Sequence, residues 1–229
     1  KSQDYYSIGS LSPSNDNGLI GYTEDNNGRR EYTIKILNPV TMKELNDVIE
    51  RTTGKFIWSY DNDHIIYLKK DPITLIADSV YLHKIGSPSS SDILLYKEND
   101  NEFNLSLSLS RTKKYIYINI ESTNSNEIRL IDTHNPMNKP LVSINRMENH
   151  LYYLEHIVEE NFFVRTNLDA PNFKVTKIKS LNNIDLANFD TVISHSNSTF
   201  INDILFITDN LVLEIRENGL PEIRIYNLK

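Results

Sequence analysis

The chain has 229 residues, of which 39% are apolar, and it carries a formal net charge of −7. This length is enough to bury a sizeable core, whereas an acidic chain does not favour nucleic acid, which calls for clustered Lys and Arg. Cysteine is absent, which excludes disulfides and thiolate metal sites, and no apolar run is long enough for a membrane span.

Five segments along the chain share one layout, in which an alternating apolar strand is followed by a polar turn and a second alternating strand. In chain order the strand pairs are 19–23 with 31–36, 65–68 with 79–85, 115–120 with 127–131, 162–165 with 173–178, and 211–215 with 222–226. Equivalent strands recur at intervals of about 46 to 50 residues. A period of this length with several strands per repeat indicates β-propeller blades.

Turn residues and flanking strands support the repeat. Asn218-Gly219 is a strong hairpin signal, because a type I′ turn needs positive φ at both central residues, and Asn27-Gly28 supports the first hairpin for the same reason. Flanking strands are expected at 55–58 and at 104–109, where Leu and Ser alternate. We therefore expect an all-β chain of about five four-stranded blades, near 4–52, 55–98, 102–145, 150–192 and 198–229.

Two segments are ambiguous in this pattern. In Thr41 to Arg51, Leu45, Val48 and Ile49 fall at helical spacing, but the repeat calls for an outer strand there, and we favour the strand. The stretch from Leu181 to Asp190 fits either a loop or a short helix.

Familiar catalytic and metal-binding patterns are missing from these 229 residues. The glycines never form the Gly-x-Ser-x-Gly elbow of an α/β-hydrolase, and Ser110 to Lys113 is interpreted as a turn although it matches Ser-x-x-Lys. Asp61 to His64 lacks the glycine and distal Glu of a calcium loop, so a turn is expected there too. No catalytic residue, metal or cofactor is predicted. The histidines are expected to be surface or packing residues: His64, His83, His134, His150, His156 and His195.

Several stretches resemble the propeller of the prolyl oligopeptidase family of serine peptidases, in its oligopeptidase B or protease II branch. The most specific is Val80–Pro88 followed by Asp92–Glu98, which is similar to that family's passage of a strand, a Leu-Gly-Thr-Pro-like turn and Val-Tyr-Glu-Glu. The others are Tyr6–Ile8 through Asn26–Ile34, Glu127–Asp132 and Phe162–Asn167. Together they occur in the family's order from about residue 4 to 226.

The resemblance implies a cytosolic serine peptidase that cuts short peptides after Arg or Lys. In the family a C-terminal α/β-hydrolase domain holds the Ser-Asp-His triad, and a seven-bladed propeller caps the site and keeps folded proteins out. By this comparison the chain covers about a third of such an enzyme, from about the second to the sixth blade. The hydrolase domain is absent from these residues, so no catalytic residue is carried over.

The expected partners follow from the same resemblance. They are the hydrolase domain of the same polypeptide and short basic peptides as substrate, with no nucleic acid and no membrane. The candidates for contact between the domains are Arg29, Arg30 and Glu31, in a hairpin loop charged like that of the family. Blade faces and strand edges left open at the ends of the arc also predict self-association of this piece.

Other functions remain open at this point. A free-standing propeller that serves as a protein-interaction scaffold would need complete blades, and the abrupt start at Lys1-Ser2-Gln3 argues against it. A propeller glycan hydrolase or lyase would need inward carboxylates near the channel, and adjacent pairs such as Glu24-Asp25 and Glu159-Glu160 point to opposite faces of a strand.

Overall fold

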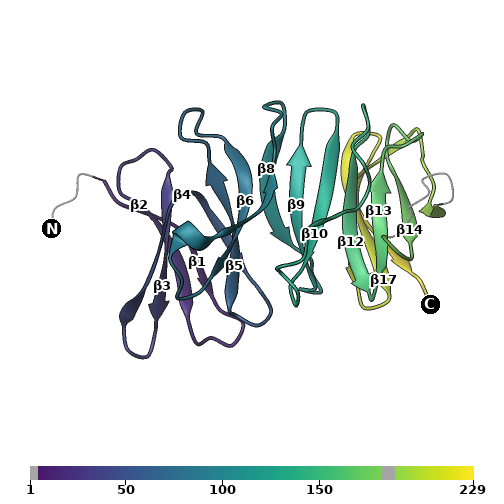
Figure 1. Ribbon diagram of the computed structural model, residues 1–229. Coiled ribbons are helices and arrows are strands. Elements are labelled where there is room, and N and C mark those ends of the chain that lie inside the picture. Colours follow the sequence, from purple (N-terminus) through teal and green to yellow (C-terminus); the bar gives the residue numbers. More distant parts are fainter. Residues whose placement is uncertain (1–4, 182–188) are drawn as a thin grey trace. The chain divides into compact units, whose positions relative to one another are not determined.

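A computed structural model of the chain describes residues 5–181 and 189–229, and within them the chain forms strands and one short 3-10 helix (Figure 1). The all-β expectation is confirmed. The stretch that fitted either a loop or a helix falls mostly on residues 182–188, which lie outside the described residues.

The first sheet has seven strands in the order β1-β2-β3-β4-β5-β6-β7. Their bounds are β1 Ser7–Pro13, β2 Ile20–Asp25, β3 Tyr32–Asn38, β4 Lys43–Trp58, β5 His64–Lys70, β6 Ala77–Lys84 and β7 Ile93–Lys97. The 3-10 helix η1, Ser89–Ser91, lies between β6 and β7. All neighbouring strands are antiparallel.

The long strand β4 belongs to two sections of this sheet. Its residues from Lys43 to Thr52 pair with β3, and those from Thr52 to Trp58 pair with β5. The sheet therefore consists of two four-stranded sections, each with the strand number of a propeller blade, that share β4. The expectation of a strand rather than a helix at 41–51 is confirmed from Lys43 onward.

Three further sheets follow. Their orders are β11-β10-β9-β8, β12-β13-β14-β15 and β16-β17-β18. The bounds are β8 Asn104–Leu109, β9 Tyr115–Glu121, β10 Asn126–Asp132, β11 Leu141–Val142, β12 Tyr152–Val158, β13 Asn161–Thr166, β14 Lys174–Ile178, β15 Asp190–Ile193, β16 Thr199–Ile207, β17 Asn210–Glu217 and β18 Leu220–Asn227.

The hairpins expected from the repeat are all present, but one turn differs from its prediction. Asn218 and Gly219 have φ values of 49° and 86°, as a type I′ turn requires. In the first hairpin the positive φ values belong to Gly28 and Arg30, not to Asn27. The loop from 26 to 31 is too long for a two-residue turn, so side-chain bonds shape it instead.

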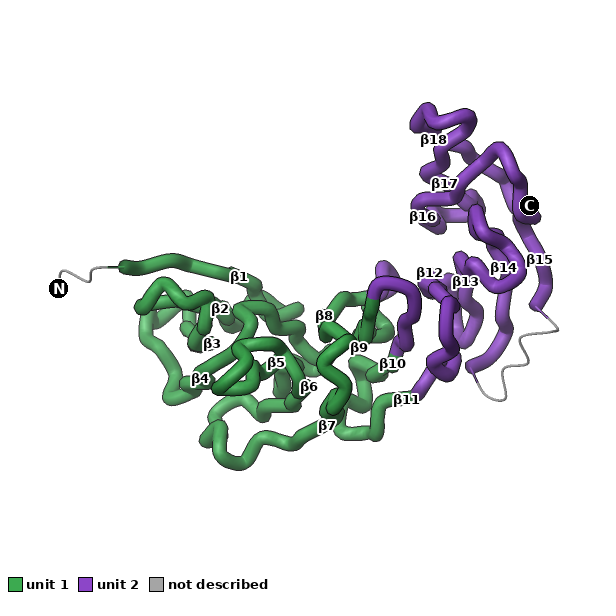
Figure 2. Tube along the Cα trace, turned by 90° about the horizontal axis from the view of Figure 1, so that it is seen from above, with its two compact units in different colours: residues 1–109, 113–122, 129–141 green, residues 110–112, 123–128, 142–229 purple. Residues whose placement is uncertain are grey.

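The described residues form two compact units, each with more contacts between its own residues than with the other unit, and Figure 2 colours them separately. Unit 1 comprises residues 1–109, 113–122 and 129–141, and unit 2 comprises residues 110–112, 123–128 and 142–229. In unit 1, one cluster of buried side chains lies between the two sections of the first sheet, and it includes Ile34, Ile49, Phe56, Trp58 and Tyr67.

The core of unit 2 packs β12–β14 against β16 and β17. Its apolar members include Phe163, Val175, Ile204 and Leu213. Polar groups are also buried there: the Tyr152 hydroxyl donates to the carbonyl of Ile144 at 2.8 Å and accepts the amide of Ile128 at 2.8 Å. Burial raises the pKa of Tyr152 to about 12, so the hydroxyl keeps its proton and can donate.

Candidate functional site

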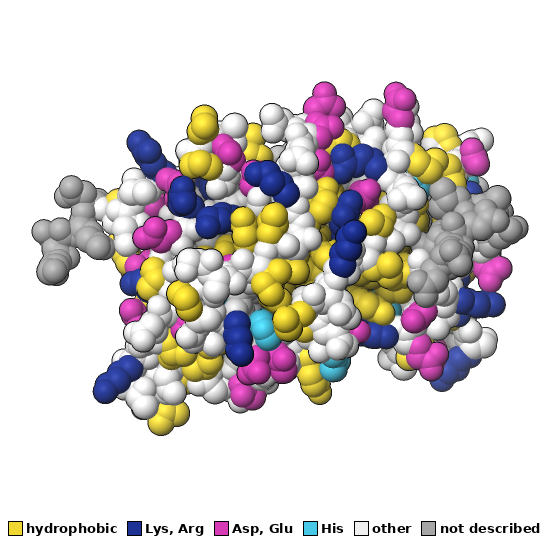
Figure 3. All heavy atoms as spheres, in the orientation of Figure 1, with side chains coloured by type: hydrophobic (Ala, Val, Ile, Leu, Met, Phe, Trp, Pro, Cys, Tyr) yellow, Lys and Arg dark blue, Asp and Glu magenta, His cyan; other side chains and the backbone are white. Residues whose placement is uncertain are grey.

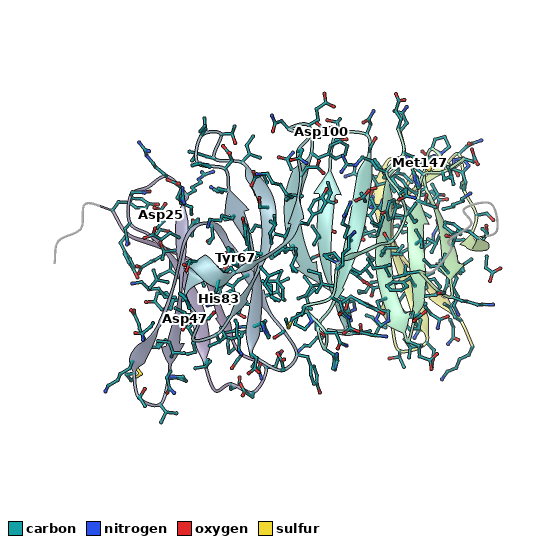
Figure 4. The ribbon with its side chains drawn as sticks, viewed as in Figure 1. Asp25, Asp47, Tyr67, His83, Asp100 and Met147 are labelled. Carbon is teal, nitrogen blue, oxygen red and sulfur yellow. The ribbon has the colours of Figure 1, made fainter. Side chains whose placement is uncertain are left out.

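Three side chains from separate parts of unit 1 meet in what we call the Asp47–His83–Asp92 cluster. The Nδ1 atom of His83, on β6, lies 2.6 Å from Oδ1 of Asp92, and its Nε2 atom lies 2.9 Å from Oδ1 of Asp47, on β4. The side chains of His83 and Asp47 are 0% exposed and that of Asp92 is 2% exposed. Figure 4 labels Asp47 and His83 close together in the first sheet, with Tyr67 beside them.

Two further donors hold the carboxylates of this cluster. The Tyr67 hydroxyl, from β5, donates to Oδ2 of Asp92 at 2.8 Å, and the backbone amide of Gly86 donates to Oδ1 of Asp47 at 2.5 Å. Oδ2 of Asp47 is buried and has no hydrogen-bond partner among the described residues. The cluster thus joins β4, β5, β6 and the connection from β6 to β7.

The electrostatics of the cluster favour a charged imidazole. Burial alone would lower the pKa of His83, but the hydrogen bonds with Asp92 and Asp47 outweigh it, and the pKa is raised. Burial and the neighbouring Asp92 carboxylate also raise the pKa of Tyr67, so its hydroxyl stays protonated. Because the His83 ring is fully buried, it cannot touch a substrate, and the cluster acts on the fold rather than as a catalytic group.

Asp47 lies on the buried face of β4, next to an irregularity in the pairing with β3. Lys35 pairs with Val48 and Leu37 pairs with Glu44, so the single residue Ile36 of β3 faces three residues of β4. Along β4 itself burial alternates, and Asp47 faces inward between Leu45 and Ile49. Val48, which contributes to the helix-like spacing of the sequence, is exposed.

Sequence reasoning missed this cluster. It treated His83 as an ordinary surface or packing residue and did not single out Asp47. The available signal was the family-like run from Val80 to Glu98, which contains both His83 and Asp92. Asp47 lies 36 positions before His83 in the sequence, and nothing local in either segment indicates that the two side chains meet.

The hairpin between β2 and β3 carries the residues predicted to contact another domain. The side chains of Arg29 and Arg30 are exposed and that of Glu31 is partly buried. Within the described residues none of the three forms an ion pair, so the two guanidinium groups are available to a partner. Lys70, from the end of β5, donates to the backbone carbonyl of Arg30 at 2.6 Å.

Positively charged side chains lie near this hairpin, with acidic ones among them. Figure 3 shows Lys and Arg side chains spread over this face of the molecule, several of them toward the N-terminal end. The exposed Arg29 and Arg30 suit acidic groups on a partner surface. Contact with another domain stays a prediction for Arg29, Arg30 and Glu31.

The remaining sequence candidates have structural roles. Asp61 to Asp63 and Ser110 to Lys113 lie in turns between strands, as expected, and His64 is the first residue of β5. His150 and His156 are buried against aromatic rings, with centroids 5.4 Å from Tyr152 and 4.9 Å from Phe162. Within the described residues there is no group of His, Asp or Glu arranged to hold a metal ion. No helix in that part of the chain is long and apolar enough to cross a membrane.

Known proteins resemble this chain over nearly all of its length. It is 32% identical over 224 residues to dipeptidyl aminopeptidase BI of Pseudoxanthomonas mexicana and 29% identical over 222 residues to protease 2 of Moraxella lacunata. These alignments cover 97% and 96% of this chain but 31% of each relative. The chain therefore spans about a third of the length of the curated relatives it matches.

Solved structures show the same fold. Oligopeptidase B from Leishmania major gives a TM-score of 0.90 at 22% identity, over 98% of this chain and 32% of that one. Oligopeptidase B from Trypanosoma brucei, with covalently bound antipain in a closed form, gives 0.87 at 24% identity, over 98% of this chain and 31% of that one. These likenesses confirm the propeller fold expected from the sequence.

A comparison with models of protein families identifies the family of this chain. Residues 1–229 match the model described as prolyl oligopeptidase, N-terminal beta-propeller domain. The match extends over all the sheets described above and over the run that contains His83 and Asp92. The chain belongs to the N-terminal β-propeller domain family of the prolyl oligopeptidases.

Proposed function

We propose that this chain forms most of the propeller that covers the α/β-hydrolase domain of a serine oligopeptidase, where it admits short peptides and keeps folded proteins out. The observation that carries the proposal is the family match over residues 1–229, together with four successive four-stranded sections of the expected type and a fifth, β16-β17-β18, that has three strands among the described residues where four were expected. No Gly-x-Ser-x-Gly elbow occurs in these residues, so the chain itself contributes no catalytic triad.

Each section of strands is one blade in this proposal. The blades extend over about 4–52, 55–98, 102–145, 150–192 and 198–229, with β4 passing from the first to the second. Blades pack side by side around a channel, and the width of that channel sets the size of what can pass. Size selection therefore depends on the rigidity of the contacts between neighbouring sections.

The proposed substrates are short peptides cut after Arg or Lys, in the cytosol. The relatives named protease 2 and oligopeptidase B support peptides as the substrate class, whereas the preference for Arg or Lys and the cytosolic location are taken from the family resemblance of the sequence. The net charge of −7 also favours approach of basic peptides. The Trypanosoma brucei relative was solved in a closed form, which suits a propeller and a hydrolase domain that open and close around substrate.

Contact with the hydrolase domain is assigned to the β2–β3 hairpin. Arg29 and Arg30 point outward from it without ion-pair partners among the described residues, and acidic side chains on the facing domain would complement them. Such contacts at a domain boundary break and form again as the domains move.

The test presents the same cleavage sequence in two substrates, a short flexible peptide and a folded protein. The full-length polypeptide that contains this chain should cleave a flexible Arg- or Lys-containing reporter peptide. It should leave the same sequence uncut when that sequence sits in a rigid loop of a folded protein. The 229-residue chain alone should cleave neither. Equal cleavage of the peptide and the folded protein would overturn the covering role, and activity of the 229-residue chain alone would overturn the claim that it is not catalytic.

A further inference from the structure

We propose that the Asp47–His83–Asp92 cluster is a proton-dependent latch, which ties the connection between β6 and β7 to β4 while it holds its proton and releases that connection when the proton is lost. The proposal goes beyond the covering role, because it concerns how two neighbouring sections of unit 1 are held together.

The number of protons in the cluster follows from the two contacts of the His83 ring. A neutral imidazole has one N–H group and one nitrogen lone pair. In this cluster both ring nitrogens face a carboxylate oxygen, at 2.6 Å and 2.9 Å. A lone pair opposite a carboxylate oxygen at such a distance is repulsive. Both contacts are attractive only if a proton lies in each, so the cluster holds one proton more than a neutral imidazole and two carboxylates.

No other cation could replace that proton. The groups that face the His83 ring are Asp47 from β4 and Asp92 from the end of the connection. The Tyr67 hydroxyl from β5 donates to Asp92, and the Tyr81 ring is stacked on Tyr67. Among the described residues neither aspartate forms an ion pair with Lys or Arg. Without its proton the cluster would be two buried carboxylates around a neutral ring, which is a costly arrangement.

The connection that the latch holds has few other attachments. It runs from Ile85 to Asp92, and η1 within it has no buried residue. Apart from bonds within the connection, its backbone is tied by the Ile85 amide to the Asp63 carbonyl at 2.8 Å, by the Ser87 amide to the Lys84 carbonyl at 3.1 Å and by the Gly86 amide to Asp47 at 2.5 Å. Ile85 packs against the buried apolar cluster of the first sheet, so loss of the Asp47–His83–Asp92 cluster frees the residues after it, 86–92, none of which is a buried apolar residue.

The direction of the pH effect follows from the raised pKa of His83. A group whose pKa is higher in the folded than in the unfolded state stabilises the fold most below its unfolded value, about 6.5 for histidine. That contribution is lost as the pH rises through the folded value. The latch is therefore closed at pH values below the pKa of His83 in the folded protein and opens at pH values above it.

The test follows the His83 ring and the backbone amides together in the full chain. Nitrogen NMR of the imidazole should show a proton on both ring nitrogens at about pH 6.5 and loss of one at higher pH. Hydrogen-exchange protection factors for Gly86 and the other amides of 85–93 should fall by up to about tenfold per pH unit between about pH 6.5 and that titration, and should level off above it. The amides of β9, Tyr115–Glu121, in the same unit, should keep their protection.

Variants separate the latch from general loss of stability. Asp47→Asn keeps the size of the side chain and removes one of the two charges that hold the proton, so both the His83 titration and the release should move to lower pH. His134→Gln, at a side chain that is 50% exposed, is the matched control and should leave both unchanged. The proposal fails if wild-type His83 titrates near its ordinary pKa, or if protection of 85–93 does not follow its titration.

Discussion

Asp25 shows how one buried carboxylate shapes the exposed hairpin that follows it. Its side chain accepts the backbone amides of Asn27 at 3.0 Å, Gly28 at 2.9 Å and Arg30 at 2.8 Å. Burial would raise the pKa of Asp25, but these bonds outweigh it and the pKa is lowered, so the carboxylate stays charged well into acid. The loop that carries Arg29 and Arg30 is therefore held in one conformation before any partner arrives.

Removing the two charges from this loop tests its proposed contact. In the full-length polypeptide, Arg29→Ala with Arg30→Ala should lower kcat/KM for an Arg-containing peptide about tenfold, which corresponds to about 1.4 kcal/mol. The salt dependence of kcat/KM should weaken as well, since exposed charges are screened. Arg216→Ala, at an exposed arginine of β17, is the control. An unchanged kcat/KM at low salt would show that the hairpin makes no such contact.

Single residues of the candidate site were only partly predictable from the sequence. Arg29 and Arg30 could be singled out because charge in a polar loop is visible in a linear sequence. The partnership of His83 with Asp47 could not be, because the two residues lie 36 positions apart and meet only when the two sheet sections pack. The unmatched Oδ2 of Asp47 is likewise a property of the assembled fold alone.

At the scale of elements, β4 is where the regular repeat and the real sheet differ. The alternation of apolar residues predicted the hairpins correctly, because each buries one face. It could not predict that one strand from Lys43 to Trp58 serves two sections, since a change of partner depends on backbone geometry. Gly54 lies in the middle of this change, with φ at +85°.

Gly54→Ala should destabilise unit 1 more than Gly86→Ala does. Both positions have positive φ, +85° and +81°, which L side chains adopt only with strain. A Cβ at Gly54 would also lie 2.7 Å from the Tyr32 ring, whereas one at Gly86 would meet nothing within 4 Å. The difference should be about 1–3 kcal/mol, the usual cost of overpacking.

Trp58 provides the measurement for this pair of variants. It is the single tryptophan of the chain, it is 5% exposed, and it lies in unit 1. Urea unfolding followed by its fluorescence should give a lower midpoint for Gly54→Ala than for Gly86→Ala. Equal midpoints would show that the close approach of Gly54 to Tyr32 does not limit stability.

At the scale of the whole molecule, the 46- to 50-residue period of the sequence was enough to predict a propeller, because each repeat must bury its faces against neighbours. The period says nothing about how tightly successive repeats are joined. The described residues form two compact units, and the boundary between the two units lies within β10. The units therefore do not coincide with the sequence repeats. Such a boundary arises from the sum of many side-chain contacts.

The final strand leads to a prediction about the 229-residue chain on its own. β18 is an edge strand, and it exposes Ile223 and Ile225, at 62% and 67%. A long edge with exposed apolar side chains invites pairing with a second copy. Sedimentation velocity should therefore show association that increases with concentration, and Ile225→Lys should reduce it, because a charge on an edge strand opposes pairing.

Ile73→Lys is the matched control for this experiment. Ile73 is 88% exposed but lies in the loop between β5 and β6, away from any strand edge. If exposed apolar surface alone drove association, both substitutions would reduce it equally, whereas pairing through β18 requires that only Ile225→Lys does so. A chain that stays monomeric on concentration would show that the edge of β18 is protected, and its alternating exposed isoleucines would then need a partner within the same polypeptide.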